Sequence, residues 1–184
     1  PNQKRQSAQR RQRKLRQTPL LQKAMPISSC PRQPHLRRRL AQMNKIPVCY
    51  CGNKRIFGGI FMSVLSILQK CKEPLEIILL TMDLSEKNPA FLPFTEEQRL
   101  LLEDTLKEYH PESSARIIDV TELQHRDFDN AKNQKNAYTP YASIRLFLDE
   151  LDVPEKLIYL DADIMCPGNI KELYEVDVEN YESE

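Results

Sequence analysis

The sequence contains no long apolar run. None of its segments approaches the roughly 18 consecutive apolar residues that a membrane-spanning helix requires. The basic N-terminal segment also lacks the apolar stretch that follows the positive charges of a secretory signal. On this basis we expect a cytoplasmic protein, which can attach peripherally to the inner face of a membrane.

The cysteines and histidines form no zinc-binding pattern. No Cys-x-x-Cys or paired-histidine motif occurs, and the three histidines lie far apart in the chain. Cys49 and Cys51 are two residues apart and should face the same side of a strand. We interpret the cysteines as small buried or half-buried thiols of a reducing compartment. They are Cys30, Cys49, Cys51, Cys71 and Cys166.

Acidic residues are missing from the first 42 positions. Residues 1–42 hold 12 of the 27 basic residues and none of the 26 acidic ones, so the remainder carries a net charge of −11. The segment is rich in Gln, Pro and Ser and has little periodicity, which predicts a disordered arm. A basic arm attracts nucleic acid or anionic membranes, but this one has no aromatic residue for base stacking and no clean amphipathic helix. We therefore expect residues 1–42 to be an arm that was appended or translated from an upstream region, with nucleic-acid binding as the less favoured alternative. The folded part is expected over 43–184.

Beyond the arm, short apolar runs alternate with helical patterns. Apolar runs bounded by turn residues are typical of strands that are buried on both faces of a parallel sheet. Their alternation with helices predicts an α/β fold with a doubly wound, mainly parallel sheet and flanking helices. The expected strands are 46–51, 75–82, 115–119 and 157–160.

Helices are expected between these strands. Thr95-Glu-Glu-Gln98 fits a capping box, so a helix should begin there and end before Pro111. Gly58 and Gly59 open an apolar helical stretch, and such small residues allow a helix to begin close to the end of the first strand. The expected elements also include helices over 60–68 and 141–148, a surface loop over 125–137 and a last helical turn over 170–174.

The last expected strand leads into two carboxylates, Asp161 and Asp163. Ligands of open α/β sheets bind outside the carboxyl ends of the strands. Two like charges placed there repel each other unless a cation or a proton shares them, and hard oxygen donors suit Mg²⁺ or Mn²⁺. The pattern therefore predicts a metal–diphosphate site. A solvated strand end and the aspartyl nucleophile of a phosphotransferase remain alternatives, although phosphotransferases favour a small turn residue where this chain has Ile164 and Met165.

Three segments resemble the family-eight glycosyltransferases. They are Ile46-Pro-Val-Cys-Tyr-Cys-Gly-Asn53 with the following Ser63-Val-Leu-Ser-Ile67, Tyr141-Ala-Ser-Ile-Arg145-Leu, and Leu157-Ile-Tyr-Leu-Asp-Ala-Asp163 with Gly168-Asn-Ile-Lys-Glu-Leu-Tyr174 in register. The resemblance covers residues 44–182, and the last motif is the most specific. It implies a GT-A fold and retaining transfer of a hexose from a UDP-sugar to a saccharide or lipid-linked acceptor, as in the synthesis of cell-surface polysaccharide or lipopolysaccharide.

The resemblance also implies roles for single residues. Asp161 and Asp163 would hold Mn²⁺ or Mg²⁺, which bridges the diphosphate, and Asp161 would also touch the ribose. Arg145 would approach the phosphate or sugar of the donor, although an ion pair with Asp149 or Asp161 is an equal alternative. Residues at the end of the first strand would cradle uridine, with a plain turn role as the alternative for the last of them. These residues are Cys51, Gly52 and Asn53.

The chain departs from the family pattern in two places. Many members carry acidic residues after the first strand, where this chain has Asn53-Lys54-Arg55. The sequence also ends 21 residues after Asp163, before the region in which the family places the acceptor site, the catalytic residue and a histidine metal ligand. We therefore expect the N-terminal, nucleotide-sugar-binding part of such an enzyme, in an apparently truncated form. A non-catalytic fragment that binds nucleotide or metal is the alternative.

Overall fold

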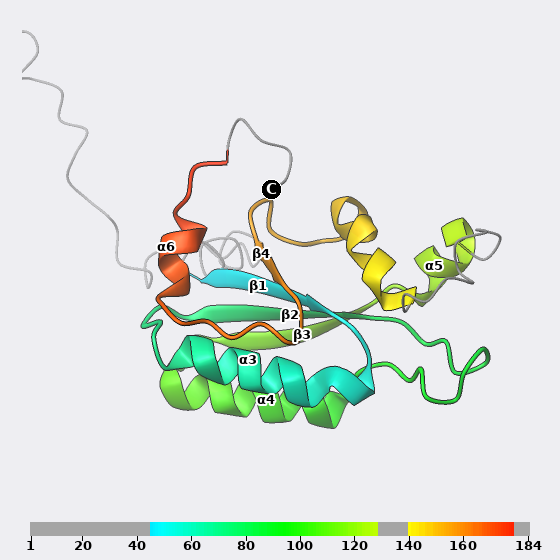
Figure 1. The fold of residues 1–184 in the computed structure, drawn as a ribbon, viewed down its shortest axis with the longest axis horizontal. Helices are drawn as coiled ribbons and strands as arrows, with labels where there is room; N and C mark the ends of the chain where they lie inside the picture. Colours follow the sequence, from blue (N-terminus) through cyan, green and yellow to red (C-terminus); the bar gives the residue numbers. More distant parts are fainter. Residues whose placement is uncertain (1–44, 129–139, 179–184) are drawn as a thin grey trace, which may run out of the picture. The chain divides into compact units, whose positions relative to one another are not determined.

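The computed structural model describes residues 45–128 and 140–178. They form a four-stranded sheet with helices on both faces (Figure 1). The strand order is β3-β2-β1-β4, and every pairing between neighbours is parallel. The predicted α/β fold with a doubly wound parallel sheet is therefore confirmed. The strands are β1 (Ile46–Cys51), β2 (Leu75–Thr81), β3 (Ser114–Asp119) and β4 (Ile158–Leu160).

The two central strands are buried on both faces. Every residue of β2 is buried, and in β1 only Cys51 is partly exposed. This explains why both strands are almost continuously apolar, since neither face of a parallel sheet covered by helices meets water. The edge strands β3 and β4 are shorter or more exposed.

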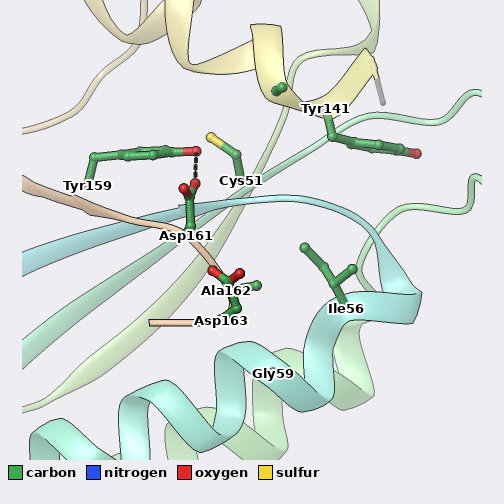
Figure 2. A pocket seen from close by; sticks show the side chains of 9 residues that line it. Cys51, Ile56, Gly59, Tyr141, Tyr159, Asp161, Ala162 and Asp163 are labelled. Carbon is green, nitrogen blue, oxygen red and sulfur yellow. Dashed lines mark hydrogen bonds between the residues drawn. The ribbon is translucent and has the colours of Figure 1, made fainter. Parts of the chain in front are cut away.

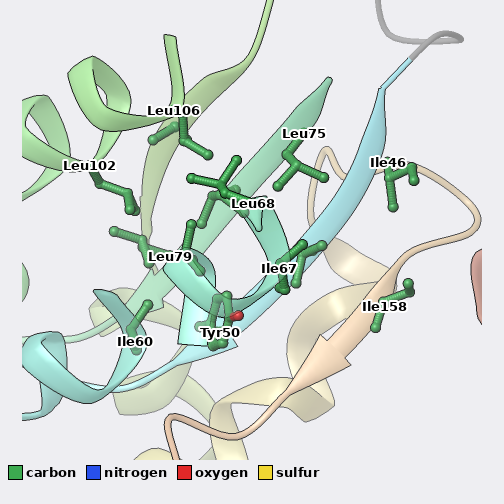
Figure 3. Close-up of a cluster of buried hydrophobic side chains, with 14 of the residues drawn as sticks. Ile46, Tyr50, Ile60, Ile67, Leu68, Leu75, Leu79, Leu102, Leu106 and Ile158 are labelled. Atoms are coloured by element: carbon green, nitrogen blue, oxygen red, sulfur yellow. The ribbon is translucent and has the colours of Figure 1, made fainter. Parts of the chain in front are cut away.

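One core lies between the sheet and two long helices, α3 (Phe57–Leu68) and α4 (Glu96–Tyr109). Alternate side chains of the central strands point into it, because successive residues of a strand face opposite sides. Figure 3 shows Tyr50 and Leu79 of the sheet among apolar residues of both helices. The helix residues at the centre of this core are Ile60, Ile67, Leu102 and Leu106.

A second core covers the opposite face of the sheet. Here Cys49, Ile78 and Leu80 pack against a 3₁₀ helix, η4 (Pro140–Glu150), and residues around α5 (Thr121–Phe128) contribute to the same cluster. Cys49 and Cys51 both belong to this side, as their spacing predicted. The neighbouring Cys51 side chain, together with burial, raises the pKa of the Cys49 thiol far above its usual range.

The helix-start signals read from the sequence are confirmed at α4. The Thr95 hydroxyl accepts a hydrogen bond from the Gln98 backbone N–H at 3.3 Å, and the Gln98 side-chain oxygen accepts one from the Thr95 N–H at 3.0 Å. The helix ends at Tyr109, two residues before Pro111, as expected.

The expected loop over 125–137 is wrong in its first part. Residues up to Phe128 are helical, and positions 129–137 lie outside the described residues. The helix forms because Asp119 accepts a hydrogen bond from the Thr121 N–H at 2.8 Å and Leu123 and Phe128 pack into the second core. The Phe128 ring also meets the Phe147 ring edge-on at a centroid separation of 5.4 Å. Tertiary packing thus overrides a locally polar sequence.

The helix expected over 141–148 is present as a 3₁₀ helix over 140–150. Its buried residues, Tyr141, Ile144 and Phe147, are spaced by three. A 3₁₀ helix has three residues per turn, so this spacing places all three side chains on one face. That face packs against the second core.

After β4 the chain turns and continues into a short helix, α6 (Ile170–Tyr174), at the position predicted for the last helical turn. The Asn169 side chain caps this helix by accepting a hydrogen bond from the Lys171 N–H at 3.0 Å. Within residues 45–128 and 140–178, no helix combines the length and the apolar character that a membrane crossing needs.

Candidate functional site

A cavity of about 530 Å³ opens at the carboxyl end of the sheet. It lies beyond the ends of β1 and β4, which are hydrogen-bonded neighbours. Figure 2 shows Cys51 of β1, Ile56 at the end of the short 3₁₀ helix before α3, Tyr141 of η4 and Tyr159 of β4 around it. This is the edge at which ligands bind in open α/β sheets. The lining residues are Cys51, Ile56, Gly59, Tyr141, Ala142, Tyr159, Asp161, Ala162 and Asp163.

The two predicted metal ligands, Asp161 and Asp163, both border this cavity. They follow directly on β4, and both side chains are exposed. The Ile164 N–H donates to the Asp161 carbonyl at 3.2 Å, which folds the segment into a turn. Neither carboxylate forms an ion pair within the described residues. Two carboxylates without a cationic partner among the described residues therefore lie at the same cavity.

Gly59 determines how close α3 can come to this turn. A Cβ atom built on Gly59 would lie only 2.7 Å from the carbonyl oxygen of Ala162. A distance below 3.0 Å from a backbone atom cannot be relieved by a rotamer change, so the close approach requires glycine at this position. The first turn of α3 thus supports the Asp161–Asp163 turn from below (Figure 2).

Tyr159 links the carboxylates to the 3₁₀ helix. Its hydroxyl donates a hydrogen bond to Oδ1 of Asp161 at 3.1 Å (Figure 2). The guanidinium carbon of Arg145 lies 5.6 Å from the centroid of the Tyr159 ring, within the range of a cation–π contact. Burial, with the nearby Cys51 and Asp161 as further causes, raises the pKa of the Tyr159 phenol, so the hydroxyl keeps its proton and remains a donor.

Tyr141 forms part of the opposite wall. Its hydroxyl donates to the carbonyl of Met82 at 3.1 Å, and its ring meets the Phe91 ring at 90° with a centroid separation of 5.7 Å. Burial raises the pKa of Tyr141 to about 12. Tyr141 and Ile56 add apolar surface to the lining of the cavity.

Three residues of the predicted donor site do not line the cavity: Gly52, Asn53 and Arg145. Asn53 is 7% exposed, and its side-chain oxygen accepts a hydrogen bond from the Arg55 N–H at 3.0 Å, so it caps the short 3₁₀ helix η2 (Lys54–Ile56). This is the turn role that was the alternative for Asn53. Arg145 contacts Tyr159, and the described residues contain no ion pair between Arg145 and either Asp149 or Asp161. Donor contacts of these three residues stay predictions.

Sequence reasoning missed several lining residues. Tyr159 could have been found, because it lies two positions before Asp161 and a strand places such residues on the same face. Gly59 was recognised only as a small residue near the strand end. Tyr141 and Ile56 reach the cavity through the packing of η4 and η2, which no local pattern reveals.

The residues present fit a hard divalent cation. Asp161 and Asp163 offer carboxylate oxygens that are exposed and carry no cationic partner in the described part of the chain. Mg²⁺ is typically held by one or two carboxylates together with the phosphates of a substrate. Among the described residues, no three His, Cys, Asp or Glu side chains come together as a complete cage. Within the described residues, these two carboxylates alone would leave further coordination positions of a cation to other groups.

The fold is that of the GT-A glycosyltransferases. The family model "Glycosyl transferase family 8" matches residues 47–182, which is most of the chain. The chain therefore belongs to glycosyltransferase family 8, as its three motifs indicated. A comparison with curated proteins found no significant match.

Solved structures support the fold. An active-site mutant of LgtC superimposes with a TM-score of 0.54 at 16% identity, over 73% of this chain and 43% of LgtC. The bifunctional glycosyltransferase WbbM gives a TM-score of 0.53 at 18% identity, over 73% of this chain and 21% of WbbM. The galactosyltransferase LgtC in complex with donor and acceptor sugar analogues gives 0.50 at 14% identity, over 72% and 43%. The chain thus spans less than half the length of each of these structures.

Proposed function

We propose that this chain carries the donor-binding part of a retaining hexosyltransferase. The donor is a UDP-hexose, and the acceptor is a saccharide or lipid-linked saccharide of a cell-surface polysaccharide or lipopolysaccharide. Membership of family 8 supports glycosyl transfer as the reaction. The observation that carries the proposal is the pair of carboxylates, Asp161 and Asp163, at the cavity beyond β1 and β4, which form no ion pair with any described residue.

In this proposal the two carboxylates hold Mn²⁺ or Mg²⁺ against the diphosphate of the donor. Such a cation, when bound, offsets the negative charge that develops on the departing nucleoside diphosphate. Asp161 and Asp163 face the same cavity, and their mutual repulsion falls when a cation lies between them. Gly59 keeps the turn that carries them close to α3, so the protein sets the position of both oxygen donors.

The nucleoside lies, in the same proposal, toward the end of β1. Cys51 borders the cavity, and Gly52 and Asn53 follow it at the strand end. Tyr141 and Ile56 supply an apolar wall on this side, which suits a flat nucleobase. Arg145 does not line the cavity but contacts the ring of Tyr159, which does, and it supplies positive charge near the donor phosphates.

Titration calorimetry of the full chain with UDP, with and without Mn²⁺, tests the proposal. We expect UDP to bind in a manganese-dependent way, and Asp161→Asn/Asp163→Asn to weaken binding by at least about 10-fold, because a charged ligand group is lost at each position. The matched control is Asp104→Asn/Glu108→Gln, which removes two exposed carboxylates from α4 and should leave affinity unchanged.

Three results would contradict parts of the proposal. Equal affinity in the wild type and the Asp161→Asn/Asp163→Asn variant would remove these residues from the site. Manganese-dependent UDP binding without any release of sugar from UDP-glucose or UDP-galactose would favour the alternative of a non-catalytic nucleotide-binding fragment. Metal-dependent hydrolysis of a phosphate ester that Asp161→Asn abolishes would instead indicate the aspartyl phosphotransferase.

A further inference from the structure

Tyr159 occupies a position between two groups of opposite charge. Its hydroxyl donates a hydrogen bond to Oδ1 of Asp161 at 3.1 Å. The guanidinium carbon of Arg145 lies over the ring of Tyr159, 5.6 Å from its centroid. The residue belongs to β4, which pairs with the buried strand β1 at Cys49. Its backbone is therefore fixed by the sheet, while its hydroxyl reaches the cavity.

The hydrogen bond from Tyr159 acts on a carboxylate that has no ion pair with the described residues. No other hydrogen bond or ion pair in the described residues holds the Asp161 side chain, whereas Asp163 has none at all. A carboxylate on an exposed turn samples several rotamers, and ordering it on metal binding costs free energy. A hydrogen-bond donor that is already in place removes part of that cost, because it holds one carboxylate oxygen of Asp161 and leaves the other free to bind the cation.

We propose that Tyr159 is a positioning residue that orients the Asp161 carboxylate for cation binding, and that the Arg145 side chain holds the Tyr159 ring in place. The inference rests on the proposed function, since it assigns Tyr159 a role at the same metal site. It adds a residue that does not touch the cation or the donor and acts through Asp161.

The geometry explains why a tyrosine serves here. Residues i and i+2 of a strand face the same side, so the Tyr159 ring extends alongside the Asp161 side chain. Partners that hydrogen-bond metal-ligating groups commonly contribute 10- to 100-fold to metal affinity. Phenylalanine at position 159 would keep the ring, the packing into the second core and the cation–π contact, and would lose only the donor.

Tyr159→Phe in the full chain tests the inference, with Tyr174→Phe as the matched control. Tyr174 also carries a cation over its ring, Lys156 at 5.3 Å, but lies on α6, away from the cavity. Free Mn²⁺ is followed by its electron paramagnetic resonance signal during titration in the presence of saturating UDP. We expect Tyr159→Phe to weaken Mn²⁺ binding about 10-fold. The free energy of unfolding should match that of the wild type, because the lost bond is exposed, and Tyr174→Phe should change neither quantity.

The outcomes separate this inference from the proposed function. Manganese affinity of Tyr159→Phe within twofold of the wild type would refute the positioning role and leave the metal site standing. A loss of affinity accompanied by an equal loss in Tyr174→Phe, or by a clear drop in unfolding free energy, would also refute it, because the effect would then be general destabilisation. Absence of Mn²⁺ binding in the wild type would overturn both proposals.

Discussion

The close approach of Gly59 to the Ala162 carbonyl leads to a sharp prediction, because α3 contains a second glycine at the adjacent position. Gly58 and Gly59 both lie in the first turn of this helix, and neither has a left-handed backbone. A Cβ atom on Gly58 would meet nothing within 4 Å, whereas one on Gly59 would meet the Ala162 oxygen at 2.7 Å. Gly58→Ala and Gly59→Ala therefore differ only in this contact.

The magnitude follows from the two opposing effects. Alanine is favoured over glycine in a helix by up to about 1 kcal/mol, and the first turn realises about half of this. Ordinary contact needs about 3.4 Å, so at Gly59 the helix and the Asp161–Asp163 turn must separate by about 0.7 Å. Overpacking of this kind typically costs about 1–3 kcal/mol. We expect Gly58→Ala to stabilise the protein by about 0.5 kcal/mol, and Gly59→Ala to destabilise it by about 1–2 kcal/mol.

Urea unfolding of the two variants measures this difference, and calorimetry with UDP and Mn²⁺ measures its effect on the site. Since the displaced turn carries both carboxylates, Gly59→Ala should also weaken manganese-dependent UDP binding several-fold, whereas Gly58→Ala should bind as the wild type does. The reasoning is refuted if Gly59→Ala is as stable as Gly58→Ala, or if it loses stability but binds UDP and Mn²⁺ with unchanged affinity.

Three further predictions concern stability, each measured by equilibrium unfolding. Tyr50→Phe should cost about 1–2 kcal/mol, because the Tyr50 and Ser63 hydroxyls share a buried hydrogen bond of 2.9 Å, and Tyr50→Phe/Ser63→Ala should recover most of the loss. Thr95→Ala removes the cap of α4 and should cost about 1 kcal/mol. The Lys107 ammonium, 2.6 Å from the Glu103 carboxylate, lowers the pKa of Glu103 in the folded state. The stability that this carboxylate contributes is therefore present above its unfolded pKa near 4.5 and is lost as the pH falls through the lower folded value. Glu103→Gln should make the free energy of unfolding fall less steeply with decreasing pH in this range.

Each of these has a result that contradicts it. If Tyr50→Phe/Ser63→Ala is no more stable than Tyr50→Phe, the cost does not come from an unpaired hydroxyl. Thr95→Ser should retain the cap, and an equal loss in Thr95→Ser and Thr95→Ala would argue against the capping bond. If the free energy of unfolding of Glu103→Gln falls with decreasing pH as it does in the wild type and in the control Glu108→Gln, other carboxylates determine stability at low pH.

Much of the fold could be predicted because its signals are local. The apolar run at β2 is buried along its whole length, and the capping box at Thr95 forms as the sequence indicated. Local signals failed where tertiary packing decided the outcome. Residues up to Phe128 form a helix because that ring packs against Phe147, and the 3₁₀ form of η4 follows from the burial of one face with a spacing of three.

By itself, the sequence determined the family and the two carboxylates at the end of β4, because a short apolar strand followed by Asp161 and Asp163 can be recognised from neighbouring residues alone, without knowledge of contacts to distant parts of the chain. The tertiary structure alone decided what surrounds them. It brings Gly59 against the Ala162 carbonyl and Tyr141 to the opposite wall of the cavity, although both lie far from Asp161 in the chain. Such contacts depend on the distance between elements and on the direction of side chains, and these are set by how the helices pack on the sheet.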